Sequence, residues 1–225
     1  MTKLEKSENP IAIAVSNRKG GVGKTTISSI LTQIALSKTD KKVCAIDLDP
    51  QKNFTDSMSL FVKNNPTLLN NLVIKDAITQ EGDFIIVDCP PALENQTKMA
   101  IEFADIIIVP IMADFFSLLN LEVVFEIGNK LGKIREQMPI VTIGFNNAGV
   151  VLSTSIRQQF SERGYFIAGD LPVHKLIPFN MAVGNQWDKG MGMEFRKQFW
   201  KLYNDIEINY KKMLNNDIKN LWNGS

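Results

Sequence analysis

Residues 17–26 read Asn-Arg-Lys-Gly-Gly-Val-Gly-Lys-Thr-Thr, and this stretch decides the fold. It lies between a short β-branched apolar segment and a segment with helical apolar periodicity, the strand, loop and helix order that a phosphate-binding loop requires. Glycines let backbone N–H groups face a phosphate, and the helix N-terminus adds free donors and partial positive charge. We therefore predict that the nucleotide is bound by Gly20, Gly21, Val22, Gly23, Lys24, Thr25 and Thr26.

The loop carries two lysines, for which we expect different roles. Lys24 matches the lysine that reaches the β- and γ-phosphates, and the Thr25 hydroxyl matches the Mg²⁺ ligand of such loops. Arg18 stands where the common G-x-x-x-x-G-K-[ST] pattern has its first glycine. Like charges repel, so we expect Lys19 to point outward, toward a nucleotide held by another copy of the chain. The alternative is a glycine-rich turn with incidental lysines, which does not need the flanking strand and helix.

Composition suits one domain with an ordinary core. The chain has 225 residues, 44% of them hydrophobic, and a formal net charge of +1, so contact with nucleic acid would have to come from a local patch. We predict a flexible lead-in over residues 1–9 and a single domain over 10–225. Cys44 and Cys89 lie in apolar segments, which predicts reduced, packed thiols and an intracellular protein. Neither a signal peptide nor a membrane span is expected, because residues 1–10 are polar and apolar runs are short.

Apolar runs alternate with amphipathic segments along the chain. Continuous apolar runs are typical of parallel strands buried on both faces, and we predict strands over Ile11–Ser16, Val43–Asp47, Phe84–Asp88, Ile106–Pro110 and Ile140–Asn146. Helices are predicted over Thr25–Ser37, Glu94–Phe103, Leu118–Met138 and Ser153–Arg163. This alternation predicts an α/β fold: a doubly wound, mostly parallel sheet flanked by helices, with ligand at the carboxyl ends of its strands.

Aspartates end two of the predicted strands. Asp47 and Asp49 follow one strand and Asp88 ends another, and the doubly wound topology brings both strand ends beside the phosphate loop. Asp88 is predicted to hold Mg²⁺ through a coordinated water. Asp47 and Asp49 face different directions, since side chains alternate along a strand. The alternative for each is a residue that caps the following turn, which for Asp47 is as plausible as a metal role.

These motifs resemble those of the ParA branch of the ParA/MinD family of deviant-Walker P-loop ATPases. Residues 17–26 resemble the deviant Walker A box, 47–51 (Asp-Leu-Asp-Pro-Gln) the A′ box, and 86–91 (Ile-Val-Asp-Cys-Pro-Pro) the Walker B box. The resemblance extends over residues 11 to roughly 200. ParA is favoured over MinD, because MinD proteins usually carry Ser-Gly-Lys-Gly-Gly in the first box and lack the Asp-Pro-Gln of the second.

The resemblance implies a weakly active ATP hydrolase that uses ATP and Mg²⁺ and forms an ATP-dependent homodimer. In such a dimer Lys19 reaches the partner's phosphates, Lys24 stabilises charge on the transferring phosphoryl group and Asp49 orients the attacking water. Thr25, Asp47 and Asp88 would manage the Mg²⁺, partly through water. We expect a short plasmid-type form without the N-terminal helix-turn-helix of larger ParA proteins. One departure is Lys52, which stands where ParA proteins often have glycine.

Predictions for the base pocket and the C-terminal segment rest on weaker patterns. Pro178 falls where the family brings a loop over the adenine, and Asn146 ends a strand near the expected base pocket, where it either reads adenine or caps a turn. Residues 191–222 carry one apolar stripe at helical spacing, which predicts a long amphipathic helix docked on the sheet or on a partner subunit. Its basic residues Arg196, Lys197 and Lys201 are candidate contacts to DNA phosphates, or simply a solvated face.

The function implied by the resemblance is DNA partition. An ATP-bound dimer would bind DNA non-specifically, and a small centromere-binding ParB-like protein would stimulate hydrolysis to release it. The protein would be prokaryotic and cytoplasmic, and associated with the nucleoid when it binds ATP. The sequence does not decide whether dimers assemble into filaments. The alternative is a MinD-like or cargo-positioning ATPase acting on a membrane or protein complex. A nitrogenase-reductase-type ATPase is disfavoured, because both cysteines lie in apparent strand segments.

Overall fold

A computed structural model describes residues 10–38, 41–92, 95–112, 140–146 and 166–172, together with Lys197 and Asn204. Within these residues one seven-stranded sheet has the order β3-β2-β4-β1-β5-β6-β7, and its strand pairs are parallel. The strands are β1 (Ile11–Val15), β2 (Val43–Asp47), β3 (Leu72–Lys75), β4 (Phe84–Asp88), β5 (Ile106–Met112), β6 (Ile140–Asn146) and β7 (Phe166–Pro172). The predicted doubly wound parallel sheet is confirmed.

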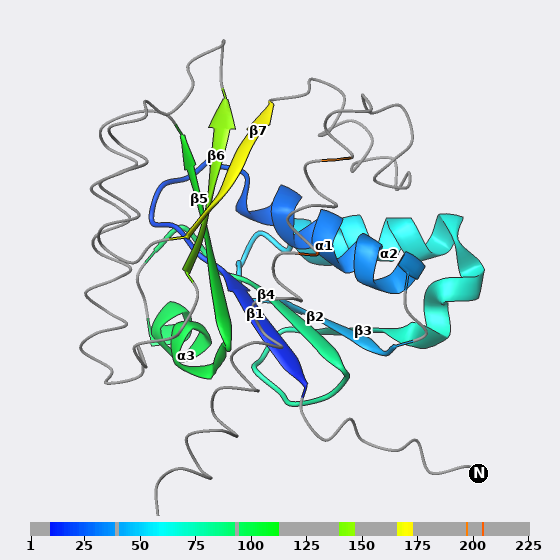
Figure 1. Cartoon of the computed structure of the whole chain (residues 1–225). Coiled ribbons are helices and arrows are strands. Elements are labelled where there is room, and N and C mark those ends of the chain that lie inside the picture. Colours follow the sequence, from blue (N-terminus) through cyan, green and yellow to red (C-terminus); the bar gives the residue numbers. More distant parts are fainter. Residues whose placement is uncertain are drawn as a thin grey trace, which may run out of the picture.

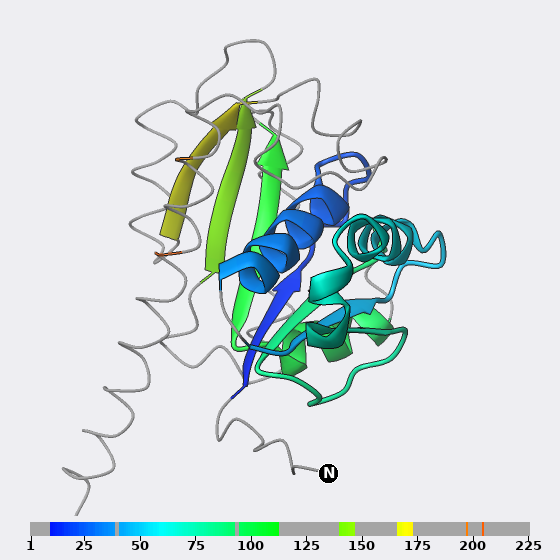
Figure 2. The same cartoon turned by 90° about the vertical axis from the view of Figure 1, so that its right-hand side faces the viewer.

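Helices cover both faces of this sheet (Figures 1 and 2). They are α1 (Lys24–Lys38), α2 (Asn53–Asn64), the 3₁₀ helix η1 (Pro66–Asn71) and α3 (Asn95–Phe103). Helices α1 and α2 lie side by side on one face, and α3 lies on the other (Figure 1).

Alternation along β1 divides the core into two layers. Ile11, Ile13 and Val15 pack with the buried side chains of α1 and α2, whereas Ala12 and Ala14 belong to the cluster that contains Ala100 of α3. Successive side chains of a strand point to opposite faces, so β1 is apolar on both. This strand, buried along its whole length, therefore delivers the phosphate loop from the interior of the sheet.

Strand register brings the predicted acidic residues to one edge. Asp88 pairs in register with Val15 of β1 on one side and with Asp47 of β2 on the other. The chain leaves β1 toward the loop at this same level. The carboxyl ends of the three strands therefore meet at the loop, as the sequence predicts.

Most predicted elements that fall on described residues agree with the structure to within one or two residues. Helix α2 and strands β3 and β7 were not predicted. The apolar side chains of α2 are buried at helical spacing: Phe54, Met58, Phe61 and Val62. This periodicity is present in the sequence, directly after the turn-forming Asp-Pro-Gln of residues 49–51. Strand β3 is only partly buried and lies at the sheet edge, and it therefore lacks the uniformly buried pattern of its neighbours.

Some predictions lie outside the described residues. These are the lead-in over residues 1–9, the helices over Leu118–Met138 and Ser153–Arg163, and nearly all of the C-terminal helix, of which Lys197 and Asn204 are helical. A single domain over residues 10–225 stays a prediction. Among the described helices, none combines the length and apolar character needed to cross a membrane.

Candidate functional site

The loop between β1 and α1 forms an open backbone cradle. Gly21 and Gly23 adopt positive φ values of 73° and 90°, a conformation that favours glycine over residues with a Cβ. Gly20 is not among the positive-φ residues, and no described atom lies within 4 Å of a Cβ built on it. The protein itself therefore does not demand glycine at position 20, whereas a ligand approaching the backbone would.

Asn17 anchors the start of the loop to a neighbouring strand. Its buried side-chain amide donates a hydrogen bond to the Pro110 carbonyl of β5 at 2.6 Å, and its Oδ1 accepts one from the Lys19 N–H at 2.8 Å. Sequence reasoning assigned Asn17 no role. The link joins residues 93 positions apart, so only the fold reveals it.

Lys24 begins α1 and lies almost completely inside the loop. The residue is 7% exposed, and its Nζ donates a hydrogen bond to the Lys19 carbonyl at 3.1 Å. Burial lowers the pKa of Lys24, while the charges of Asp88 and Asp49 act in the opposite direction. The ammonium is thus held by a neutral carbonyl of the loop, a partner that phosphate oxygens could replace with a stronger bond between opposite charges.

Asp88 is held by two hydroxyl groups of α1. Its Oδ2 accepts a hydrogen bond from Thr25 Oγ1 at 2.7 Å, and its Oδ1 accepts one from Ser28 Oγ at 2.9 Å. The carboxyl is 1% exposed, and burial raises its pKa to about 7, against the opposing effect of the two hydroxyl bonds. Ser28 was missed by sequence reasoning, although it lies one helical turn after Lys24 and so shares its face.

Thr25 and Asp88 fit a magnesium site in their donor chemistry. A hydroxyl and a carboxylate oxygen 2.7 Å apart are hard oxygen ligands, which Mg²⁺ prefers. The described residues contain no group of three or more His, Cys, Asp or Glu side chains able to hold a metal. Mg²⁺ does not need one, since it is usually bound by one or two protein groups, substrate phosphates and water.

Asp47 has different partners from Asp88. Its Oδ1 accepts a hydrogen bond from the Asp49 N–H at 3.1 Å and its Oδ2 accepts one from the Thr55 N–H at 2.8 Å. Thr55 lies in the first turn of α2, where backbone N–H groups lack helical partners. These contacts favour the turn-capping alternative, and the metal role of Asp47 stays a prediction.

Asp49 lies in the turn between β2 and α2, half-buried and close enough to Lys24 for their charges to interact. Its Oδ1 accepts a hydrogen bond from the Gln51 N–H at 2.9 Å. Lys52 in the same turn has φ 55° and ψ 25°, a left-handed conformation that costs a non-glycine residue about 1–2 kcal/mol. Its Nζ donates a hydrogen bond to the Asp47 carbonyl at 2.7 Å.

The remaining predicted site residues are only partly described. Within the loop Val22 is buried, and Lys19, Gly23 and Thr26 are partly exposed. Asn146 ends β6 as predicted, but its side chain, like Pro178, Arg196 and Lys201, lies outside the description. Their roles stay predictions.

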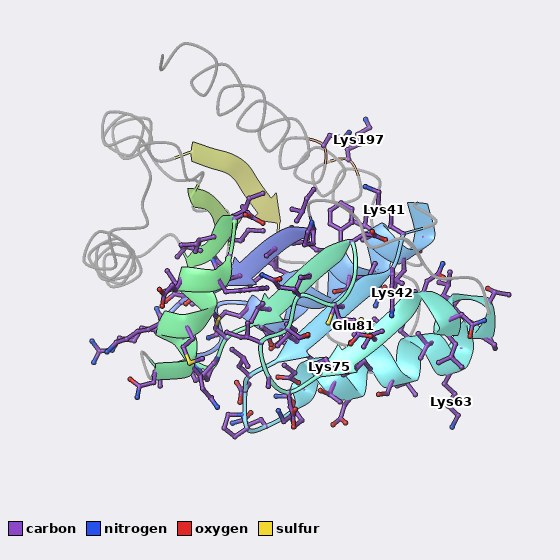
Figure 3. All side chains as sticks on the ribbon, turned by 90° about the horizontal axis from the view of Figure 1, so that it is seen from below. Lys41, Lys42, Lys63, Lys75, Glu81 and Lys197 are labelled. Atoms are coloured by element: carbon purple, nitrogen blue, oxygen red, sulfur yellow. The ribbon has the colours of Figure 1, made fainter. Side chains whose placement is uncertain are left out.

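The lysines seen from below the molecule do not form an unopposed basic patch. Lys42 and Lys75 both contact Glu81, each with an N–O distance of 3.0 Å, and the three side chains lie together in Figure 3. Lys197 is helical and exposed. The described surface therefore adds no DNA contact to those predicted from the sequence.

Comparison with known proteins gives a family. The model of a family described as "AAA domain" matches residues 11–82 and 62–140. The Soj protein of Bacillus subtilis, named a sporulation initiation inhibitor, is 27% identical over 152 residues, covering 47% of this chain and 60% of its own length. The chromosome partitioning protein ParA of Caulobacter vibrioides is 26% identical over 234 residues, covering 79% and 84%.

Solved structures agree on the fold. A Borrelia burgdorferi structure described as a putative plasmid partition protein bound to AMPPNP has a TM-score of 0.68 at 20% identity, covering 91% of this chain and 100% of that one. The match thus covers less than two thirds of the length of the Soj protein and the whole length of the Borrelia structure. Because the family model spans more than half of the 225 residues and the relatives are partition proteins, the chain belongs to this AAA-domain family and, within it, to the ParA-type P-loop ATPases.

Proposed function

We propose that this chain hydrolyses ATP with Mg²⁺ and acts as a partition ATPase. The observation that carries the proposal is the convergence of Lys24, Thr25 and Asp88 at the open glycine loop, with Asp49 close enough to Lys24 for their charges to interact. A cation, a hydroxyl–carboxylate pair and a second carboxylate are the groups that phosphoryl transfer from a nucleotide requires.

Each described residue then has a part in hydrolysis. The attacking water forms a bond to the γ-phosphorus and loses a proton to the solvent, while the bond to the β–γ bridging oxygen breaks and leaves its electron pair on ADP. Lys24 stabilises the negative charge that develops on the phosphoryl oxygens. Asp49 orients the water, and Thr25 and Asp88 would hold a Mg²⁺ ion, which would supply positive charge to offset that of the phosphates. Positioning of this kind predicts a slow reaction until a partner completes the site.

A second proposal concerns assembly. Lys19 is only partly buried, and its backbone carbonyl already accepts the bond from Lys24. We propose that its ammonium reaches the nucleotide of a second copy, so that ATP favours a sandwich dimer. The dimer would bind DNA without sequence preference, and a centromere-binding partner would stimulate hydrolysis.

The test combines DNA binding with nucleotide and salt. In a gel-shift assay we expect ATP-dependent binding that weakens steeply with salt, as contacts to phosphates do, and that is lost in Lys19→Ala. The matched control is Lys63→Ala, which removes an exposed lysine from the last turn of α2. DNA binding that is indifferent to nucleotide would refute the partition role while leaving the ATPase intact.

The alternative is a MinD-like or cargo-positioning ATPase with a membrane or protein target. It shares the hydrolytic site but not the DNA. Sedimentation with liposomes, with and without ATP, separates the two: ATP-dependent recovery with the lipid, in a protein that gives no DNA shift, would favour the alternative.

A further inference from the structure

Lys52 adopts a left-handed backbone conformation and has no direct part in the proposed hydrolysis. Among the described non-glycine residues it is the one with positive φ. A Cβ makes this left-handed conformation unfavourable, and glycine is the residue that adopts it freely. A lysine here must be held in place by other contacts.

Those contacts come from the side chain and backbone of Lys52 itself. Its Nζ donates a hydrogen bond to the Asp47 carbonyl at 2.7 Å, and its N–H donates one to the Asp49 carbonyl at 3.0 Å. Lys52 therefore binds the strand end at Asp47 and the middle of the turn at Asp49. A bond from an ammonium to a backbone carbonyl is charge-assisted and stronger than a neutral one.

Two further bonds close the same turn around Asp49. The Asp49 N–H donates to Asp47 Oδ1 at 3.1 Å, and the Gln51 N–H donates to Asp49 Oδ1 at 2.9 Å. Helix α2 begins directly after the turn, at Asn53. The orientation of Asp49 thus depends on a network of hydrogen bonds among four residues of the turn: Asp47, Asp49, Gln51 and Lys52.

We propose that Lys52 is a positioning residue for hydrolysis: its ammonium fixes the turn over residues 47–52 so that Asp49 faces the phosphate loop and the attacking water. The inference rests on the proposed ATPase function. Lys52 itself touches neither nucleotide nor water; it acts through Asp49. Asp49 lies close enough to Lys24 of the loop for their charges to interact, and the hydrogen bonds of the turn hold it there.

If Lys52 has this role, different substitutions at position 52 should have different effects. Lys52→Met keeps the strained backbone but removes the ammonium, so the turn loosens. Lys52→Gly removes the ammonium and the strain together, so the turn persists without help. Lys52→Arg keeps a cationic donor. An ammonium that bound the nucleotide directly would instead make glycine and methionine equally harmful.

The kinetic test measures kcat and KM for ATP in these three variants. We expect kcat to fall about tenfold in Lys52→Met, the loss of roughly one charge-assisted hydrogen bond, with KM unchanged. Lys52→Gly and Lys52→Arg should keep kcat within about threefold of wild type. Lys63→Met is the matched control, since Lys63 points away from the fold at the far end of α2 (Figure 3). A raised KM in Lys52→Met, or glycine as impaired as methionine, overturns the proposal.

A second measurement does not depend on hydrolysis. Hydrogen exchange of the Asp49 and Lys52 amides in the nucleotide-free protein should quicken in Lys52→Met and stay unchanged in Lys63→Met. Lys52→Gln replaces Lys52→Met if the latter fails to fold. Unchanged exchange overturns the positioning role. If exchange is faster in Lys52→Met but the wild-type protein hydrolyses no ATP, the proposed function is refuted and the structural role of Lys52 remains.

Discussion

Asp47 and Asp88 occupy the same level of neighbouring strands, yet their surroundings differ. They pair in register at the ends of β2 and β4, and both are almost completely buried. Asp88 accepts hydrogen bonds from the hydroxyls of Thr25 and Ser28, whereas Asp47 accepts them from two backbone N–H groups.

The difference separates a carboxylate that can exchange its partners from one that cannot. A hydroxyl can rotate and offer its own oxygen to a metal, so Thr25 and Asp88 can turn from each other to Mg²⁺. Backbone N–H groups only donate, and releasing them leaves buried donors unsatisfied. The position of an aspartate at a strand end therefore does not determine its role; its partners do.

The largest expected effect concerns Asp88→Asn. The substitution keeps the shape but removes the negative charge that holds Mg²⁺, so we expect ATP turnover to fall at least about a hundredfold, as for loss of a major transition-state contact. Steady-state phosphate release measures it. Turnover within about threefold of wild type would show that Asp88 is not part of the metal site.

The pH dependence of stability sharpens the comparison. Burial raises the pKa of Asp88 from its usual 3.8 to about 7, and the effect on stability is to be measured without nucleotide or Mg²⁺. Between these values the folded state holds a proton on Asp88 that the unfolded state has lost, so the contribution of Asp88 to stability is greatest below about pH 4 and declines as pH rises to about 7.

Denaturant unfolding across this range measures that decline. We expect the stability of Asp88→Asn to fall less over the same interval and to exceed that of wild type at pH 8, because no buried charge has to form. Parallel curves for the two proteins would contradict the assignment.

Asp47→Asn should act on stability more than on the metal. The amide oxygen can accept one of the two N–H bonds, but the NH₂ group would face the other donor, which costs about 2 kcal/mol. Urea unfolding measures this loss. If the Mg²⁺ concentration for half-maximal ATPase activity rises as well, Asp47 has the metal role predicted from the sequence; if it stays constant, the residue caps the turn.

The smallest expected effect concerns Ser28, whose hydroxyl is the second to donate a hydrogen bond to Asp88. Ser28→Ala frees Asp88 Oδ1, so we expect Mg²⁺-dependent ATP binding to weaken about threefold to tenfold, the usual worth of one hydrogen bond. Ser29→Ala is the matched control: that hydroxyl is equally buried on the next residue and has no hydrogen-bond partner among the described residues. Binding measured in EDTA should not distinguish the two variants.

Much of this arrangement could be predicted from local sequence. The apolar runs gave the central strands, and the glycine loop with its flanking pattern placed Lys24 and Thr25 at a helix start. The meeting of Asp47 and Asp88 followed from parallel topology, since the carboxyl ends of parallel strands lie at one edge.

What the sequence could not give depends on contacts between distant segments. The bond from Asn17 to Pro110 joins the loop to β5, and the bond from Ser28 to Asp88 joins α1 to β4, 60 positions apart. Asp47 and Asp88 look alike in sequence, because the groups that distinguish them lie on α1 and α2. Lys52 was visible as a departure from the ParA pattern, but its left-handed backbone was not.

The central claim is that the glycine loop and Asp88 form a site for ATP with Mg²⁺. The most direct test is phosphate release from ATP by the wild-type chain, with Mg²⁺ and with EDTA, beside Lys24→Ala. We predict slow turnover that requires Mg²⁺ and disappears in the variant, because the phosphoryl charge loses its cation. Equal turnover by the two proteins, or turnover that is unchanged in EDTA, would contradict the account.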